Sequence, residues 1–441
     1  MKTLAVLLGG LFLLWPAALN GYPLVFTDTG GFLHQTLGPL MIWDKPWIYG
    51  PLLHLFHWRV TLWAPLLAQG VLVSWLLWLA LRALGRASPL RHLGICAALA
   101  VLTTAPWSTA LLMPDILVVA VVLPALLLGL GWEGLSRAER VGVFLAALLG
   151  TASHLSFLPL AAGLVVVVAL LARWWPGARA SGALVRTALP LLGALALLLG
   201  TNRIGHGVWS VSPHGSTFLL ARLIADGPAA RTIAARCPEA GWYLCAWAGR
   251  LPADSDDFLW REYSPMNRDA AGHARFLGGA LLSPEARIIV GETLAREPGA
   301  VLLAVLGNGL RQLGMVRAGD TLMATDLDIA LRPRLLDIPG DLATYDAGLQ
   351  AQGRLPAVAE PFFWPYLPVL LLTLPLLGFG VAAAWRLGDR RPACLAVIVL
   401  AALLGNALAT GGLSKPHHRY QARIVWLLPF AALVAVLPRR G

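Results

Sequence analysis

Three short polar stretches hold the side chains of this sequence that could do chemistry. Asp28 lies in GYPLVFTDTGGFL after the first apolar segment, Asp115 follows Pro114 in WSTALLMPDILVV, and SKPHHRYQ (414–421) precedes the last apolar segment. A carboxylate in such a position can accept a proton from an attacking hydroxyl, and partial burial would raise its pKa toward a useful range. The forked donors of Arg419 suit a phosphate. The three stretches together indicate acid–base chemistry on a phosphate-bearing substrate.

Each of these residues also has a structural interpretation. Asp28 or Thr29 could cap a short interfacial helix. Asp115, in the first turn of an apolar run, could interact with the helix dipole. Arg419 and Tyr420 could anchor a helix at a membrane edge. The run HHRY is denser in polar groups than an anchor requires, which favours a functional role for it.

The composition indicates the elements that position these residues. The chain has 441 residues, of which 58% are hydrophobic and only 13% charged. Soluble domains carry about 25% charged residues, so we expect an all-α polytopic membrane protein. The net charge of +11 comes from arginines in short loops between apolar segments, as the positive-inside rule predicts, and this argues against a nucleic-acid partner.

We expect about ten transmembrane helices, since a span needs about 20 apolar residues. They cover 3–20, 59–82, 92–107, 113–132, 141–154, 156–173, 185–201, 362–385, 392–410 and 421–437. The chain then divides into an N-terminal membrane region (1–201) with about seven spans and a first outer loop (21–58), an extracytoplasmic segment (202–361) with amphipathic helices, and a C-terminal membrane region (362–441) with about three spans. The pair 141–154 and 156–173 is short and could form a hairpin that does not fully cross.

The basic loops orient these spans. Ten spans place Lys2 and the arginine clusters near 82–91, 137–140, 173–186, 386–391 and 439–440 on one face, which the positive-inside rule makes cytoplasmic. Both termini are then cytoplasmic, and the first loop, the segment 202–361 and the turn 411–420 face the opposite side. The sequence therefore predicts a multi-pass protein of a bacterial-type inner (plasma) membrane, with membrane lipids as partners.

The outer segment shows weaker patterns. Cys237 and Cys245 could close a small disulfide loop in an oxidising compartment. The stretch 283–298 suits a helix that starts at Ser283, and 300–316 reads as an amphipathic helix on the membrane or on the bundle. His54 and His57 lack a third metal ligand, and the acidic turn at 254–257 lacks the EF-hand spacing. No metal site is predicted, although a divalent cation stays open as a cofactor.

The arrangement of these features resembles the GT-C superfamily of membrane glycosyltransferases. The resemblance lies in a short first span, an acid in the following loop, a second acid after a proline near a later span, and an Arg-Tyr pair before a late span. It implies that Asp28 acts as the base on the acceptor or positions it, and that Asp115 matches the acid of the second outer loop. It also implies that Arg419 and Tyr420 belong to the turn that holds the donor phosphate. The chain departs from the pattern at Thr29, where many relatives have a second acid.

Three functions follow as alternatives. The first is transfer of a sugar from a polyprenyl-phosphate donor to a lipid or glycan acceptor, with Asp28 as base, Arg419 on the leaving phosphate and help from Lys415 or His418. His34 of the first loop is a further candidate for substrate binding. The second is a lipid or glycolipid transporter or flippase, and the third is a non-catalytic membrane protein of envelope assembly.

Overall fold

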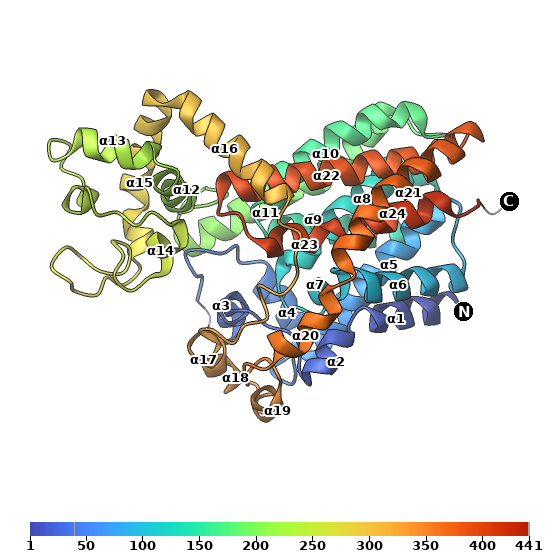
Figure 1. The fold of residues 1–441 in the computed structure, drawn as a ribbon, viewed down its shortest axis with the longest axis horizontal. Helices are drawn as coiled ribbons and strands as arrows, with labels where there is room; N and C mark the ends of the chain where they lie inside the picture. The colour runs from blue at the N-terminus through green and yellow to red at the C-terminus, as the bar shows by residue number, and fades with distance from the viewer. Residues whose placement is uncertain (39, 440–441) are drawn as a thin grey trace.

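The computed structural model describes residues 1–38 and 40–439, and within these ranges the chain forms helices and loops without a strand. A bundle of roughly aligned helices fills most of Figure 1, and a smaller helical lobe projects from one end of it. Both chain termini lie at the opposite end. We call these the lobe end and the terminal end of the bundle.

The bundle is built from the N-terminal and C-terminal parts of the chain. Its first half contains α1 (Lys2–Phe12), α2 (Trp15–Asn20), α5 (Trp63–Ala83), α6 (Pro89–Leu102), α7 (Ala105–Thr109), η1 (Pro114–Val118), α8 (Val119–Gly129), η2 (Trp132–Gly134), α9 (Arg137–Ser153), α10 (Phe157–Leu171), η3 (Ala172–Trp174) and α11 (Ala180–His206). Its second half contains α20 (Leu355–Phe363), α21 (Tyr366–Arg386), α22 (Arg391–Leu413), α23 (His418–Val425) and α24 (Leu427–Val436).

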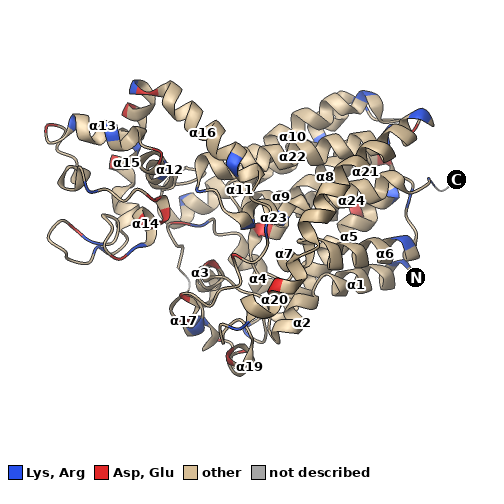
Figure 2. Cartoon of the chain, in the orientation of Figure 1, with Lys and Arg blue, Asp and Glu red and all other residues tan. Residues whose placement is uncertain are grey.

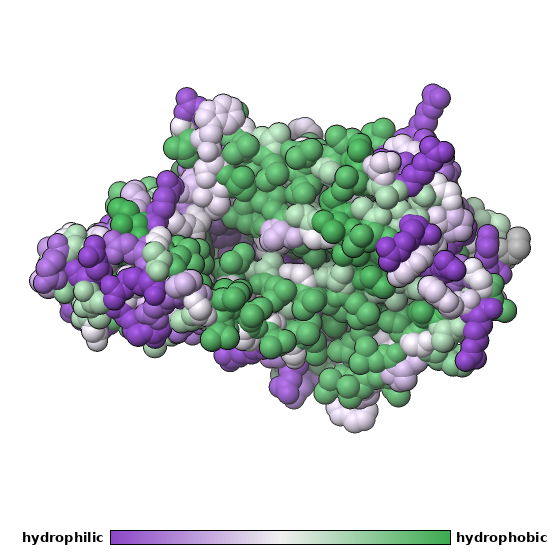
Figure 3. Space-filling view, turned by 90° about the horizontal axis from the view of Figure 1, so that it is seen from above, coloured by the Kyte–Doolittle hydropathy of each residue, from purple (hydrophilic) through white to green (hydrophobic). Residues whose placement is uncertain are grey.

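Six stretches of helix in the described residues are long and apolar enough to cross a membrane. They are Trp63–Ala83, Phe157–Trp174, Ala180–His206, Leu355–Arg386, Arg391–Leu413 and His418–Val436. Figure 3 shows a broad hydrophobic band over the bundle with hydrophilic groups at both ends, as expected for a multi-pass membrane protein. The membrane character predicted from composition agrees with these helices, whereas the number of ten spans stays a prediction.

The ten predicted spans and the six long apolar helices differ in number where helices are short or broken. The predicted span 3–20 is divided into α1 and α2, with Pro16 in the first turn of the second helix. The predicted span 113–132 begins with the 3-10 turn η1, which starts at Pro114 and leads into α8. Proline lacks the N–H group that continues a helix, so it favours such starts and breaks. Hydropathy detects the apolar stretch but not its division.

Residues 202–361, predicted as one segment, pack in two parts. The helical lobe consists of α12 (Gly215–Ala225), α13 (Pro228–Arg236), η4 (Tyr243–Trp247), α14 (Ser255–Trp260), α15 (Gly278–Arg296) and α16 (Pro298–Leu313). It has an apolar core of its own, which includes Leu220, Ile233, Phe258, Leu282 and Ile289. By contrast, the short helices α17 (Leu327–Ala330), α18 (Arg332–Leu335) and α19 (Leu342–Ala347) contribute Leu327, Leu331, Leu335 and Tyr345 to the large core of the bundle.

Two helices of the lobe refine the sequence-based expectations. The helix expected to start at Ser283 begins earlier, as α15 at Gly278, and holds Pro284 in its interior. The stretch expected to be amphipathic is α16, which leans from the lobe onto α22 (Figure 1). The two helices touch so closely that a Cβ atom added at Gly411 would lie 2.5 Å from the carbonyl oxygen of Asn308. Glycine is therefore required on α22 at this contact.

Ion pairs join the loops at the terminal end. Glu139 accepts hydrogen bonds from both Lys2 and Arg82, at 3.0 and 2.6 Å, and Arg86 pairs with Asp389 at 3.0 Å. Figure 2 shows several segments of basic residues at this end. The arginine clusters that the sequence analysis assigned to one face therefore lie together at one end of the bundle.

Candidate functional site

Asp28 lies in the first turn of α3 (Thr27–Leu37), where its carboxylate pairs with two cations. One carboxylate oxygen is 3.0 Å from Lys45 Nζ and the other is 3.5 Å from Arg419 Nη1. The capping contact of this helix belongs to the next residue, since Thr29 Oγ1 accepts the backbone N–H of Phe26 at 2.9 Å. Asp28 is thus free to hold two distant segments of the chain together.

The backbone of α3 is tightly enclosed beside Asp28. A Cβ atom added at Gly30 would lie 1.9 Å from the carbonyl oxygen of Ala330, at the end of α17. The glycine in the motif DTGGF is therefore explained by this close packing of α17 on α3. The packing fixes the helix turn from which Asp28 projects.

Arg419, at the start of α23, lies against two aromatic rings. Its guanidinium carbon lies 4.5 Å from the ring centre of Phe26 and 4.9 Å from that of Tyr420. Its Nη2 donates to the Tyr420 hydroxyl at 3.1 Å, and its backbone N–H donates to Asp320 at 2.8 Å. Stacking fixes the plane of a guanidinium while leaving its edge available to an anion.

Asp115 pairs with a second arginine, one helical turn further along α23. Arg423 Nη1 donates to the Asp115 carboxylate at 3.1 Å, and both side chains are almost completely buried. Arg423 Nη2 donates to Asn406 Oδ1 at 2.8 Å and to Ser156 Oγ at 3.0 Å. This network joins η1, α10, α22 and α23 at the lobe end of the bundle.

The three ion pairs form one charged cluster, which we name the acid–arginine cluster: Asp28, Lys45, Asp115, Arg419 and Arg423. Arg419 and Arg423 are four residues apart and therefore lie on the same face of α23. The ring of Tyr420 lies beside both guanidinium groups, 4.9 and 5.2 Å from their central carbons. His154 is close enough to all but Lys45 to interact with them electrostatically, and its Nδ1 lies 2.8 Å from Ser156 Oγ.

The charges around Asp28 determine its protonation state. Burial alone would raise the pKa of this carboxyl, but the positive charges of Lys45 and Arg419 outweigh that effect and hold the pKa below its usual value. Conversely, the pKa of Lys45 is raised, because the neighbouring Asp28 and Asp44 carboxylates outweigh its burial. Asp28 is therefore an ionised carboxylate at neutral pH.

The other predicted binding residues lie in different contacts. Lys415 Nζ pairs with Asp254 at 2.7 Å and Asp256 at 3.0 Å, which ties the turn before α23 to α14 of the lobe. His418 Nδ1 accepts the backbone N–H of Arg317 at 3.1 Å. Lys415 and His418 thus contribute to the attachment of neighbouring segments, and their contacts do not include the acid–arginine cluster.

His34 is on α3, six residues beyond Asp28. The pKa of its imidazole is lowered, first by burial and then by the charge of Arg334, while Asp337 acts in the opposite direction. The charged groups that act on His34 are therefore those in and after α18.

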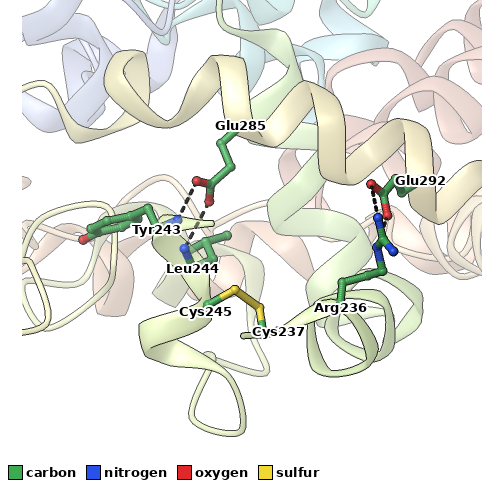
Figure 4. The surroundings of a disulfide bond; sticks show 7 residues. All are labelled: Arg236, Cys237, Tyr243, Leu244, Cys245, Glu285 and Glu292. Atoms are coloured by element: carbon green, nitrogen blue, oxygen red, sulfur yellow. Dashed lines mark hydrogen bonds and ion pairs between the residues drawn. A yellow bond between two sulfur atoms is a disulfide. The ribbon is translucent and has the colours of Figure 1, made fainter. Parts of the chain in front are cut away.

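The lobe is held by a disulfide between Cys237 and Cys245 (Figure 4). Beside it, the Glu285 carboxylate on α15 accepts the backbone N–H groups of Tyr243 and Leu244, at 2.6 and 3.1 Å. Arg236 and Glu292 pair on the other side of the bridge, with Nε 2.8 Å from the carboxylate. The disulfide thus closes the loop between α13 and η4, and the contacts of Glu285 and Glu292 attach that loop to α15.

Lys45, Arg423 and His154 are part of this site but are not among the residues predicted from the sequence. Lys45 follows Asp44 in a loop, and nothing local indicates that it reaches Asp28. Arg423 carried a usable signal: it is a charge within an apolar helix and is spaced by four residues from Arg419, and buried charges in such helices mark functional sites by default.

No group of three or more His, Cys, Asp or Glu side chains that could hold a metal ion occurs in residues 1–38 and 40–439. What the cluster offers instead is an ionised carboxylate beside an aromatic-stacked arginine at the end of a membrane-type bundle. Comparisons of the chain with protein-family models, curated proteins and solved structures find no match.

Proposed function

We propose that this chain is an integral membrane glycosyltransferase that moves a sugar from a polyprenyl-phosphate donor to a lipid or glycan acceptor. The observation that carries the proposal is the contact between Asp28 and Arg419, which are 391 residues apart in sequence. A transfer of this kind needs a base beside the attacking hydroxyl and a cation beside the leaving phosphate. The acid–arginine cluster supplies both groups at the polar end of an apolar bundle.

In the proposed reaction the acceptor hydroxyl attacks the anomeric carbon of the sugar. The bond from that carbon to the phosphate oxygen breaks, and Asp28 takes the hydroxyl proton. Arg419 binds the departing phosphate through the edge of its guanidinium, while Phe26 and Tyr420 hold its plane. The phosphate is already a good leaving group, so positioning and charge neutralisation supply most of the rate enhancement.

The pairing in the free protein suits this exchange of partners. Asp28 is a weak base while Lys45 and Arg419 lower its pKa. A donor phosphate that binds Arg419 replaces Asp28 as the partner of that arginine. The pKa of Asp28 then rises, because one of its two cations is neutralised. Substrate binding would therefore create the stronger base that proton removal needs.

Asp115 and Arg423 have a supporting role in this scheme. Their buried pair fixes the first turns of α23, from which Arg419 projects. We infer that Asp115 sets the position of the phosphate-binding arginine and shapes the inner wall of the substrate site. The terminal end, with its arginine-rich loops, would face the cytoplasm of a bacterial-type inner membrane, and the lobe would be extracytoplasmic.

The test is sugar transfer by the purified full chain in liposomes that contain a panel of polyprenyl-phosphate sugars. We expect Asp28→Asn to lower kcat by roughly 10²–10⁴-fold, the range for loss of a positioned base. Arg419→Lys keeps the charge but loses the fork, and should raise KM for the donor. Asp346→Asn removes an acid from an exposed pair with Arg332 and is the matched control, with activity unchanged.

Full transfer by folded Asp28→Asn would overturn the assignment of the base. Movement of a polyprenyl-phosphate sugar across the liposome bilayer without a covalent product would favour the transporter alternative. Release of polyprenyl phosphate in step with acceptor glycosylation supports the transferase.

A further inference from the structure

A second charged region lies at the terminal end of the bundle, far along α22 from the acid–arginine cluster. A groove of about 740 Å³ opens there between the ends of α21 and α24, the loop after η3 and the loop before α22. Binding pockets for small molecules have volumes of about 300–1,000 Å³. The groove is therefore large enough for a ligand of headgroup size.

The lining of the groove has a large excess of positive charge. Five arginines and one aspartate contribute to it: Arg86, Arg173, Arg390, Arg391, Arg439 and Asp389. The single carboxylate is already engaged, since it accepts Arg86 Nη2 at 3.0 Å and the backbone N–H of Arg391 at 3.2 Å. The remaining positive charge calls for an anion.

Three of these arginines lie against tryptophan rings. The guanidinium carbon of Arg173 is 4.6 Å from the ring centre of Trp174, that of Arg390 is 5.1 Å from Trp385, and that of Arg391 is 5.5 Å from Trp175. Aromatic contact restrains the guanidinium groups without using their edge donors. The groove therefore presents several partly fixed donors to an oxygen-rich ligand.

The rest of the wall is apolar and continuous with the surface of the bundle. Phe379, Gly380, Ala435 and Val436 line the groove on α21 and α24, and Phe379 is 71% exposed. The hydrophobic band and the hydrophilic terminal end meet in Figure 3. A free phosphate ion would leave this apolar wall uncovered, whereas a phospholipid would cover it with its acyl chains.

We propose that this groove binds an anionic phospholipid. The phosphodiester contacts Arg173, Arg390 and Arg439, and the acyl chains lie along Phe379 and the outer faces of α21 and α24. Basic pockets between membrane helices are a known physical solution for anionic headgroups. The site is separate from the acid–arginine cluster and does not depend on the proposed transferase activity.

The experiment measures lipid binding to the purified full chain in a neutral detergent, by native mass spectrometry with dioleoyl phosphatidylglycerol. The test variant is Arg390→Gln/Arg439→Gln, which spares the buried Arg86. We expect its affinity to fall roughly 25-fold, since each of the two arginines near an anionic lipid contributes about fivefold. The control pair Arg137→Gln/Arg179→Gln removes the same charge from exposed positions outside the groove and should change the affinity by less than about twofold.

Size-exclusion elution and helix content establish that each variant is folded before binding is compared. Equal losses in the two pairs would overturn the proposal, because they would mean attraction to overall charge. Binding of phosphatidylcholine with the same affinity as phosphatidylglycerol would also overturn the proposal. Displacement of phosphatidylglycerol by equimolar inorganic phosphate would identify a phosphate site and contradict the lipid assignment.

Discussion

At the lobe end of the bundle, Arg419 and Arg423 are matched by Asp28 and Asp115, whereas five arginines around the groove at the terminal end share Asp389. The paired residues at the lobe end are mostly buried and connect segments that are distant in sequence. The second set is mostly exposed and in excess over acid. The difference indicates that each arginine of the lobe-end pairs has a carboxylate partner within the fold, so an anion that binds Arg419 must displace Asp28, whereas the arginines at the terminal end outnumber the single aspartate among them.

The largest effect should follow from breaking the most deeply buried pair. Arg423→Met leaves the Asp115 carboxylate buried without its cation, and removal of one partner of such a pair costs about 3–5 kcal/mol. We expect a lower thermal unfolding midpoint in detergent. The double variant Asp115→Leu/Arg423→Met should recover part of the loss, because no isolated charge remains.

Arg332→Met is the matched control for this prediction. Its partner Asp346 is 43% exposed, and an exposed ion pair contributes little to stability, so we expect almost no change in the unfolding midpoint. If Arg423→Met unfolds at the same temperature as Arg332→Met, the buried pair does not stabilise the lobe end as we infer.

The composition and the polar stretches were enough to predict a helical membrane protein and to select Asp28, Asp115, Arg419 and Tyr420. The structure brings these four to the lobe end, with direct contacts from Asp28 to Arg419 and from Arg419 to Tyr420. Their partners could not be predicted, because Lys45 reaches Asp28 through a loop whose path depends on tertiary packing.

Other sequence-based assignments depended on topology alone. The polar run 414–421 groups Lys415 and His418 with Arg419 in the sequence. In the structure Lys415 instead pairs with Asp254 at the start of α14, and His418 accepts the backbone N–H of Arg317. Neighbouring residues in the first turn of a helix project in different directions. Residues that are adjacent in sequence therefore need not belong to the same site. The number of spans depended in a similar way on helices that Pro16 and Pro114 interrupt.

Acidification should have a smaller effect, on the contact between the turn 414–417 and Asp256 of the lobe. Burial by itself raises the pKa of Asp256, but His417 and Lys415 outweigh it and bring the pKa to about 2, below the ordinary value of 3.8. A carboxyl with a lowered folded-state pKa stabilises the fold above pH 3.8, and this contribution is lost as pH falls from 3.8 to 2.

Amide exchange of residues 414–417, corrected for the intrinsic pH dependence, measures this loosening. An increase in opening of up to about fivefold is expected, in keeping with a partly exposed ion pair. In the Lys415→Met variant, residues 414–417 should open to a similar extent already at neutral pH. Their amide exchange should then change less on acidification. A transition centred above about pH 5 would instead exclude the carboxylates as its cause.

The smallest effect should be the loss of one exposed arginine at the terminal end. Arg439 lies close to the like charge of Arg391, so Arg439→Gln should change the free energy of unfolding by less than about 0.5 kcal/mol. Arg86→Gln is the informative counterpart, because Arg86 is 2% exposed, pairs with Asp389 and donates to the Leu437 carbonyl at 2.9 Å. It should destabilise the same end by several times more. If both variants unfold alike, then position along the bundle, and not burial with a partner, determines what an arginine contributes.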